Sequence, residues 1–276
     1  MLEPIQSKRN QLARAQELGI PAPRTTTDPS EDLMFPVLVK PSDPVGFRRT
    51  FKLQSFRCET RAEFDEAWER AQPYEPLIQE WIPGGDDELY TLGCYLARDG
   101  EALGVFSGRK LLQTPPGVGS GRICESIWVD KVVDQGLAYL RGLECFGLSQ
   151  TEFKRDPRDG AYKLMEVNPR LWQWHGLARA CGVDLPRIAY LDVLGRPPSP
   201  VLSGPVHDGR RWVVAAAHLR ASRTEGTPLR RALREMGPHP VEGTFDIRDP
   251  LPAIVQASGL VTAPIARALR RRGRRP

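Results

Sequence analysis

The chain has 276 residues and a formal net charge of +5, and its 40% hydrophobic and 26% charged residues are typical of a globular protein that can bury a substantial core. It has no run of about twenty apolar residues that could cross a bilayer, and its N-terminus lacks the apolar centre of a secretory signal, so we expect a cytoplasmic protein without membrane association. The five cysteines and four histidines are scattered without metal-ligand spacing, which gives no signal for a zinc site, a disulfide framework or a Ser-His-Asp triad.

The N-terminal part of the sequence predicts alternating helices and strands. A helix is expected over residues 7–18, and Gly19 ends it. Residues 35–41 form a short apolar, β-branched run that ends in Lys40 and a proline, the pattern of a strand that delivers a cation to a cleft. The elements expected next are a loop over 42–46, a strand over 51–56 and a helix from Thr60 to Ala71.

The middle of the sequence predicts strands joined by tight turns. Residues 76–82 form an apolar run that stops at a Pro-Gly turn, and the run over 89–96 turns back into residues 102–106. A loop with two prolines and three glycines follows at residues 115–121, and such loops on a rigid sheet are where substrate contacts concentrate. Two helical stretches are expected over 129–143 and 178–194, the second with an interruption at Pro186.

A predicted hairpin over residues 151–168 carries the clearest functional pattern. Side chains two apart on a strand share a face, so Glu166 and Asn168 point the same way, and Glu152 on the first arm can be their neighbour. Two adjacent anions repel each other unless a cation lies between them, and hard oxygen ligands suit Mg²⁺ held jointly with substrate phosphates. Arg170 adds a fork for phosphate oxygens. The alternative is an exposed hairpin with ordinary surface acids.

The phrase Glu166-Val167-Asn168-Pro169-Arg170 resembles the ATP-grasp superfamily, whose metal site is a carboxylate on one strand followed by Glu-x-Asn on the next. In the carbamoyl-phosphate-synthetase branch, the second strand reads Glu-x-Asn-Pro-Arg, and the likeness continues into residues 177–186. The sequence is most similar to the carboxylate–amine ligases of this superfamily, the group that includes proteins like D-aspartate ligase. The resemblance covers the sequence up to about residue 200.

The resemblance implies roles for the hairpin and for two lysines. Lys8 and Lys40 would face the phosphates of ATP. Lys40 and Arg170 would also be catalytic, because they would neutralise the transferring phosphoryl group. Three oxygen-bearing side chains would bind Mg²⁺ or Mn²⁺: Glu152, Glu166 and Asn168.

The other implied roles concern the nucleoside and the acceptor. Glu88 would accept hydrogen bonds from the ribose hydroxyls, the alternative being a solvated acidic turn. Backbone groups at three positions would read adenine: Glu80, Trp81 and Ile82. Three further residues are candidates for contacting the acceptor or the triphosphate: Arg109, Lys110 and Glu125.

The resemblance also implies an α+β fold, the ATP-grasp fold, in which two α/β lobes hold ATP between two antiparallel sheets. We expect a small lobe over residues 1–80, a C-terminal lobe with the metal site over 81–200, and a small extension over 201–276. In relatives another α/β domain precedes the first helix, so we expect that domain to be missing here or supplied from elsewhere, by a homo-oligomer or a partner chain.

The C-terminal extension begins after a proline-rich linker at residues 196–200. An added strand is expected over 211–217 and a short helix over 228–235. Much of the positive charge lies in the last residues of the chain: Arg267, Arg270, Arg271, Arg272, Arg274 and Arg275. Terminal basic runs of this kind are most often solvated, so we do not expect nucleic acid as a partner.

The expected activity is the ATP- and Mg²⁺-dependent ligation of a small-molecule carboxylate to an amine, or to a thiol, through an acyl phosphate; amino acids are candidate substrates. Phosphoryl transfer needs charge neutralisation and alignment more than a protein nucleophile, which agrees with the lack of a triad. Two alternatives stay open. A degenerate ATP-grasp module would bind nucleotide without ligating, which the glycine-poor segment 42–49 favours, and a basic nucleic-acid-binding protein is favoured by the arginine tail.

Overall fold

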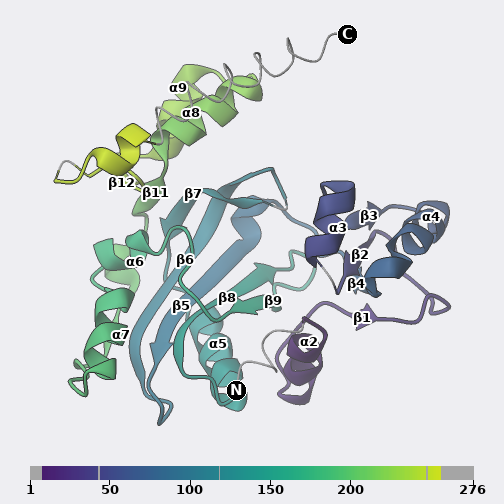
Figure 1. Ribbon diagram of the computed structural model, residues 1–276, viewed down its shortest axis with the longest axis horizontal. Coiled ribbons are helices and arrows are strands. Elements are labelled where there is room, and N and C mark those ends of the chain that lie inside the picture. The colour runs from purple at the N-terminus through teal and green to yellow at the C-terminus, as the bar shows by residue number, and fades with distance from the viewer. Residues whose placement is uncertain (1–7, 43, 118, 247, 256–276) are drawn as a thin grey trace, which may run out of the picture.

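The computed structural model describes residues 8–42, 44–117, 119–246 and 248–255. Two β-sheets organise the chain, and helices pack on both, so the fold class is α+β as expected (Figure 1). The smaller sheet and its helices form one lobe, and the larger sheet with its helices forms the other. None of the described helices is both long and apolar enough to cross a membrane.

The smaller lobe contains a four-stranded antiparallel sheet in the order β1-β4-β2-β3. Buried side chains from β2, β4 and α4 form its core, among them Val39, Phe64 and Ile78. Its elements are β1 (Thr25–Thr26), β2 (Val37–Pro41), α3 (Pro44–Phe51), β3 (Phe56–Cys58), α4 (Arg61–Ala71), the 3₁₀ turn η1 (Gln72–Tyr74) and β4 (Pro76–Glu80).

The structure differs from the sequence prediction between residues 42 and 56. The expected loop and second strand are replaced by helix α3, and β3 begins only at Phe56. Phe47 and Phe51 lie one helical turn apart and therefore reach the same aromatic cluster. The Phe47 ring centroid lies 5.0 Å from that of Phe56 and 5.5 Å from that of Tyr74. These contacts come from elements distant in the chain, which is why the local pattern did not reveal the helix.

The larger sheet runs in the order β12-β11-β7-β6-β5-β8-β9, with β10 paired to β6. The strands β5 to β9 pair antiparallel with one another, whereas β10 pairs parallel with β6. The central strands are β5 (Leu89–Leu96), β6 (Ala102–Thr114), β7 (Ser120–Ser126), β8 (Gly147–Arg155) and β9 (Tyr162–Asn168). A 3₁₀ turn, η2 (Asp86–Glu88), leads from the smaller lobe into β5.

Helices cover both faces of the larger sheet. On one face, α2 (Lys8–Glu17) and α5 (Asp130–Gly142) pack on a core that includes Leu92 and Phe153. On the other face, α6 (Gly176–Ala180) and α7 (Leu185–Val193) pack on a core that includes Tyr95 and Trp174 (Figure 1). The predicted interruption at Pro186 lies instead over residues 181–184, because proline is tolerated in the first turn of a helix.

The segment after residue 200 extends the larger sheet. β11 pairs with β7, and the buried Arg122 of β7 forms an ion pair with Glu225 at 2.6 Å. The expected strand over 211–217 ends at Val213, because the alanine-rich residues that follow begin α8. The elements are β10 (Val201–Leu202), η3 (Pro205–His207), β11 (Arg211–Val213), α8 (Ala215–Thr224), α9 (Leu229–Met236) and β12 (Val241–Glu242). The arginine run from Arg267 onward lies outside the described residues.

Gly93 of β5 gives a test of how the larger sheet packs. A Cβ atom at this position would lie 1.9 Å from the Trp172 ring, which rests directly on the strand backbone. We expect Gly93→Ala to lower the free energy of unfolding by about 1–3 kcal/mol, the usual cost of overpacking a core. Urea unfolding would measure the change. Gly176→Ala is the control, because a Cβ there meets nothing within 4 Å; equal effects of the two substitutions would contradict the packing argument.

Candidate active site

A cavity of about 530 Å³ lies between the two lobes. β2 and α3 of the smaller lobe form one wall, β8 and β9 of the larger lobe form another, and the glycine-rich loop before β7 contributes to the lining. Most of the residues predicted from the sequence meet there. The predicted residues in the lining are Lys40, Glu80, Trp81, Ile82, Lys110, Glu152, Glu166, Asn168 and Arg170.

The β8–β9 hairpin brings the three predicted metal ligands together. Glu152 lies directly opposite Glu166, and Asn168 lies opposite Gln150. The Asn168 amide donates a hydrogen bond to Glu166 Oε1 at 3.0 Å, and the Gln150 amide donates one to Glu152 Oε1 at 3.1 Å. Each carboxylate is therefore oriented by a neighbouring amide. Gln150 is only 4% exposed, so its amide has little freedom to turn away.

A β-bulge explains how β9 serves the core and the cavity together. The register shifts between Glu152 and Phe153, so that Phe153 faces Leu164 and Met165 is the extra residue. Leu164 and Glu166 would share a face on a regular strand. Because of the bulge, Leu164 is fully buried in the core under α5, whereas Glu166 lines the cavity.

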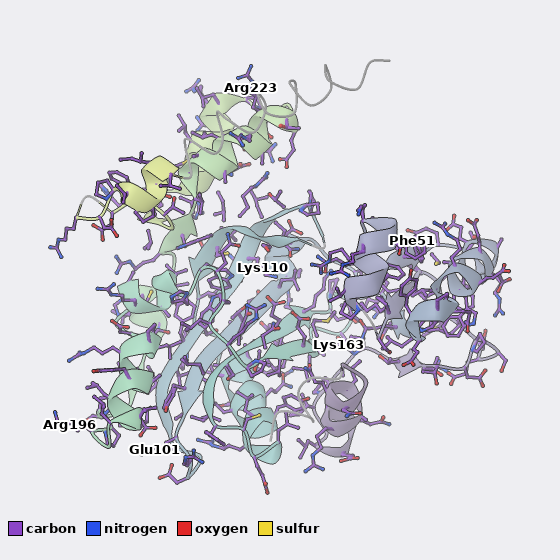
Figure 2. The ribbon with its side chains drawn as sticks, in the orientation of Figure 1. Phe51, Glu101, Lys110, Lys163, Arg196 and Arg223 are labelled. Carbon is purple, nitrogen blue, oxygen red and sulfur yellow. The ribbon has the colours of Figure 1, made fainter. Side chains whose placement is uncertain are left out.

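Lys110 of β6 places a buried cation beside the carboxylates. Its Nζ lies 2.8 Å from Glu152 Oε1, and it donates a hydrogen bond to Gln113 Oε1 at 3.3 Å. Burial opposes the charged form of this lysine, but Glu152, with a smaller contribution from Glu166, outweighs burial and raises the pKa of Lys110 above its ordinary value. Figure 2 shows Lys110 over the middle of the larger sheet.

These residues fit a hard divalent cation held jointly with phosphates. Glu152 and Glu166 face each other across the hairpin, and the amide of Asn168 beside them offers an oxygen as a further ligand. The ammonium group of Lys110 lies next to Glu152. In the described part of the chain, no cluster of three or more His, Cys, Asp or Glu side chains could hold a metal ion alone. Such an oxygen set suits a divalent cation that completes its coordination with phosphate oxygens and water rather than with a protein cage.

Two further cations that the sequence predicted line the cavity, in addition to Arg48 and Lys154. Lys40 extends from β2, and its Nζ donates a 2.5 Å hydrogen bond to Gln79 Oε1 on the neighbouring strand β4. Gln79 is 2% exposed and therefore fixes where the ammonium group lies. Arg170 follows β9 directly, is exposed, and donates to the Leu171 carbonyl at 3.1 Å.

The segment that joins the two lobes, residues 80–82, also lines the cavity, and we call it the hinge. Trp81 is held between two cations: the Arg57 guanidinium lies 4.3 Å from the ring centroid and Lys154 Nζ lies 4.9 Å from it. The Glu80 N–H donates to the Arg24 carbonyl at 2.8 Å, and the Trp81 N–H donates to the Pro36 carbonyl at 3.4 Å. These two N–H groups therefore already have partners within the smaller lobe.

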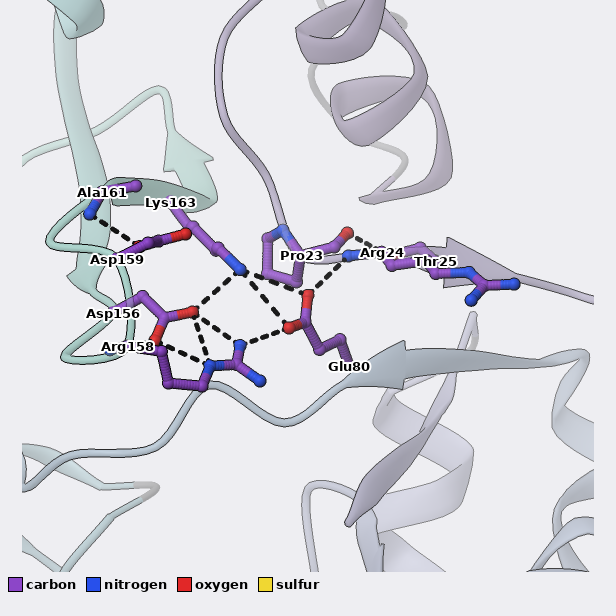
Figure 3. Close-up of polar contacts among 9 residues, drawn as sticks. All are labelled: Pro23, Arg24, Thr25, Glu80, Asp156, Arg158, Asp159, Ala161 and Lys163. Carbon is purple, nitrogen blue, oxygen red and sulfur yellow. Dashed lines mark hydrogen bonds and ion pairs between the residues drawn. The ribbon is translucent and has the colours of Figure 1, made fainter. Parts of the chain in front are cut away.

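The Glu80 side chain joins the two lobes (Figure 3). Its carboxylate pairs with Arg158 and, at 3.3 Å, with Lys163, both from the β8–β9 hairpin. These two cations also pair with the buried Asp156, at 2.6 Å and 2.9 Å. Hydrogen bonds from Arg158 hold the pKa of Asp156 far below its usual range, against the opposing effect of burial. The cluster thus anchors the hinge to the turn of the hairpin.

Four predicted residues are not part of this arrangement: three lie off the cavity lining, and the side chain of the fourth is not described. The side chain of Lys8 lies outside the described part of the structure. Glu88 lies off the described cavity lining and pairs with Arg155 at 3.3 Å. Arg109 and Glu125 also lie off that lining and pair with each other at 2.9 Å, because the alternation of β6 and β7 directs them away from it.

The sequence prediction did not single out several lining residues. Gln150 and Lys154 share the face of Glu152, so period-2 alternation on β8 was the signal that could have found them. Gln113 carried no such signal, because its role depends on Asp86 from the distant turn η2, which accepts from its Nε2 at 2.8 Å. The aromatic wall formed by Trp172 and Trp174 was likewise hidden, because irregular residues after β9 place it.

Comparison with known proteins identifies sequence relatives of the chain. No family model matches the chain. It is 28% identical over 197 residues to a D-aspartate ligase from Enterococcus faecium, a match that covers 64% of this chain and 47% of that protein. It is 27% identical over 199 residues to the C-terminal section of the carbamoyl phosphate synthase large chain from Methanopyrus kandleri, covering 66% of this chain and 36% of that protein. The chain thus spans less than half the length of these curated relatives.

A solved structure shares the fold. A complex of biotin carboxylase with an ATP analogue, from Campylobacter jejuni, superposes with a TM-score of 0.61 at 14% sequence identity. The match covers 72% of this chain and 48% of that chain. At this identity the likeness concerns the fold, and it confirms the expected arrangement of two lobes around a central cleft.

The Asp156 cluster makes a prediction about pH and stability. The folded-state pKa of Asp156 lies below the unfolded value of about 3.9, so its stabilising effect is complete above that value and is lost as the pH falls toward the folded-state pKa. We expect Asp156→Asn to lower the free energy of unfolding by about 2–3 kcal/mol near neutral pH, because it removes one partner of a buried ion pair. The difference from wild type should shrink below about pH 4.

Urea unfolding over a range of pH measures this difference. Asp159→Asn in the same turn is the matched control, because Asp159 is exposed and accepts only the local Ala161 N–H bond that the structure records at 2.8 Å. A deficit in Asp156→Asn that stayed constant down to pH 3 would show that the charge of Asp156 is not the source of the stabilisation.

Proposed function

We propose that this chain, a member of the ATP-grasp superfamily, carries out the ATP-dependent ligation of a carboxylate to an amine through an acyl phosphate. The observation that carries the proposal is the meeting of several cations and two facing carboxylates in one cavity between the lobes. The sequence likeness to named ligases supports the same reaction class.

The residues divide into four roles in this reaction. Glu152, Glu166 and Asn168 would hold Mg²⁺, which when bound neutralises phosphate charge and aligns the phosphate oxygens. Lys40 would bind the phosphates as a compact cation fixed by its hydrogen bond to Gln79.

The remaining roles concern the acceptor side and the base. Arg170 at the end of β9 would stabilise the transferring phosphoryl group or the acyl phosphate. The carbonyl groups of the hinge around Trp81 would read the adenine, and the ring itself would line that end of the cavity.

The chemistry then takes two displacement steps. A carboxylate oxygen of the first substrate attacks the γ-phosphorus of ATP, the bond to the β-phosphate oxygen breaks, and ADP leaves. The nitrogen of the second substrate attacks the carbonyl carbon of the acyl phosphate, inorganic phosphate leaves with the former carboxylate oxygen, and the nitrogen loses a proton. No protein nucleophile takes part, so the cavity needs only to neutralise charge, align the groups and exclude water.

Amino acids are the substrate class that we propose. The name of the Enterococcus faecium relative supports this choice, since that protein is a D-aspartate ligase. A pooled amino-acid screen for ATP-dependent release of inorganic phosphate, followed by mass spectrometry of the products, would identify the carboxylate and the amine. Release of phosphate only in the presence of both a carboxylate and an amine is the expected outcome.

Glu166→Gln tests the metal role. The carboxamide keeps the volume of the side chain but removes the ligand charge that offsets the metal, so ATP-dependent phosphate release should fall at least about a hundredfold while circular dichroism stays unchanged. Glu144→Gln is the control, because Glu144 is exposed and lies in the turn after α5. Full turnover in purified Glu166→Gln would exclude Glu166 as a metal ligand.

Lys40→Ala tests the phosphate role. Loss of one charge-assisted hydrogen bond should weaken ATP binding by about 1–3 kcal/mol, as measured by calorimetry. Lys52→Ala is the control, since Lys52 follows α3 and donates to the Arg49 carbonyl of the same turn at 2.7 Å. An unchanged ATP affinity in Lys40→Ala would make Lys40 a structural residue.

A further inference from the structure

Lys110 occupies the position from which it can act on the proposed metal site before any ligand binds. The residue is 7% exposed, and its ammonium group lies 2.8 Å from a carboxylate oxygen of Glu152. The second carboxylate, that of Glu166, stands directly across the hairpin from Glu152. The buried ammonium group therefore lies beside the pair of acids that would bind the metal.

A chain of hydrogen bonds fixes this lysine in place. Gln113 donates from its backbone N–H and from Nε2 to the Asp86 carboxylate, at 2.7 Å and 2.8 Å. This orientation of the amide turns Oε1 of Gln113 toward Lys110, which donates to it at 3.3 Å. The Gln113 side chain is 2% exposed. Lys110 is thus held from one side by an oriented amide and from the other by Glu152, without help from a nucleotide.

The position has an electrostatic consequence for divalent cations. A free Mg²⁺ ion that approached Glu152 and Glu166 would meet an ammonium group already paired with one of them, and like charges at a few ångströms in a poorly solvated cavity repel strongly. An ion that arrives with a nucleoside triphosphate brings negative phosphate oxygens. These oxygens ligate the ion and also offer Lys110 a new partner, so the repulsion is relieved.

We propose that Lys110 is a built-in counter-ion that excludes free divalent cations from the Glu152–Glu166 pair, so that the metal enters this site only together with the nucleotide phosphates. The inference rests on the proposed function for the location of the metal and the nucleotide. It assigns to Lys110 a positioning role, because the residue controls the charge of the carboxylate pair before the reaction begins.

The test uses Mn²⁺ as the probe and the full chain without nucleotide. Electron paramagnetic resonance counts free Mn²⁺ during a titration. Wild type should bind Mn²⁺ weakly, Lys110→Met should bind it at least about tenfold more tightly because the repelling charge is gone, and Lys110→Arg should remain weak because it keeps the charge. Addition of a non-hydrolysable ATP analogue should bring Mn²⁺ binding by wild type to a level at least as tight as that of Lys110→Met.

Lys154→Met is the matched control. Lys154 is the other buried lysine of the cavity lining and shares the β8 face of Glu152, but its Nζ donates to the Gly84 carbonyl at 3.0 Å. Its replacement should leave nucleotide-free Mn²⁺ affinity within about twofold of wild type, since its charge is directed toward the hinge. An equal gain of affinity in both variants would mean that any positive charge in the cavity acts in this way, and the specific role of Lys110 would be lost.

Wild type alone can overturn the inference if Lys110→Met does not fold. Mn²⁺ binding by wild type that is as tight without nucleotide as with the analogue would contradict it, and so would an unchanged affinity in a folded Lys110→Met. These outcomes are separate from those for the ligase proposal. A chain that takes up Mn²⁺ only with the analogue but never releases phosphate with any substrate pair would support the inference and count against ligase activity.

Discussion

Two carboxylates that face each other across a hairpin constrain the rest of the larger lobe. Glu152 and Glu166 stand opposite each other in a partly buried position, where like charges repel, and the ammonium group of Lys110 lies 2.8 Å from Glu152 and offsets that repulsion. The bulge at Met165 is part of the same arrangement. It lets β9 bury Leu164 under α5 and still present Glu166 to the cavity, so core packing and site geometry do not compete for the same strand face.

The two lobes meet through charge as well as through the chain. Glu80 ends β4 of the smaller lobe, and its partners Arg158 and Lys163 belong to the same hairpin that carries the acids. The hinge and the β8–β9 hairpin are therefore fixed to each other by one cluster, which the buried Asp156 completes. This attachment sets the spacing between the hinge end and the hairpin end of the cavity.

The sequence carried the fold class and the β8–β9 hairpin with its facing acids, because these depend on local signals. Period-2 alternation placed Glu166 and Asn168 on one face, and a Ser/Thr-x-x-Glu spacing found the start of α4, where Thr60 Oγ1 accepts from the Glu63 N–H at 3.3 Å. Helix α3 was missed, because its aromatic partners come from β3 and η1. The pairing of Lys110 was hidden for the same reason, since β6 and β8 lie on either side of β5 and only the assembled sheet brings the two side chains together.

The strands after residue 200 cover an edge of the larger sheet that a truncated chain would expose. β7 is seven residues long, and β11 covers part of its outer edge while the Arg122–Glu225 ion pair holds α8 against it. A chain cut at the proline-rich linker would expose that edge as a row of unpaired backbone groups, which are a template for pairing with another molecule. Such a fragment would keep its cavity residues and still fail in practice, because it would be lost to self-association rather than to unfolding.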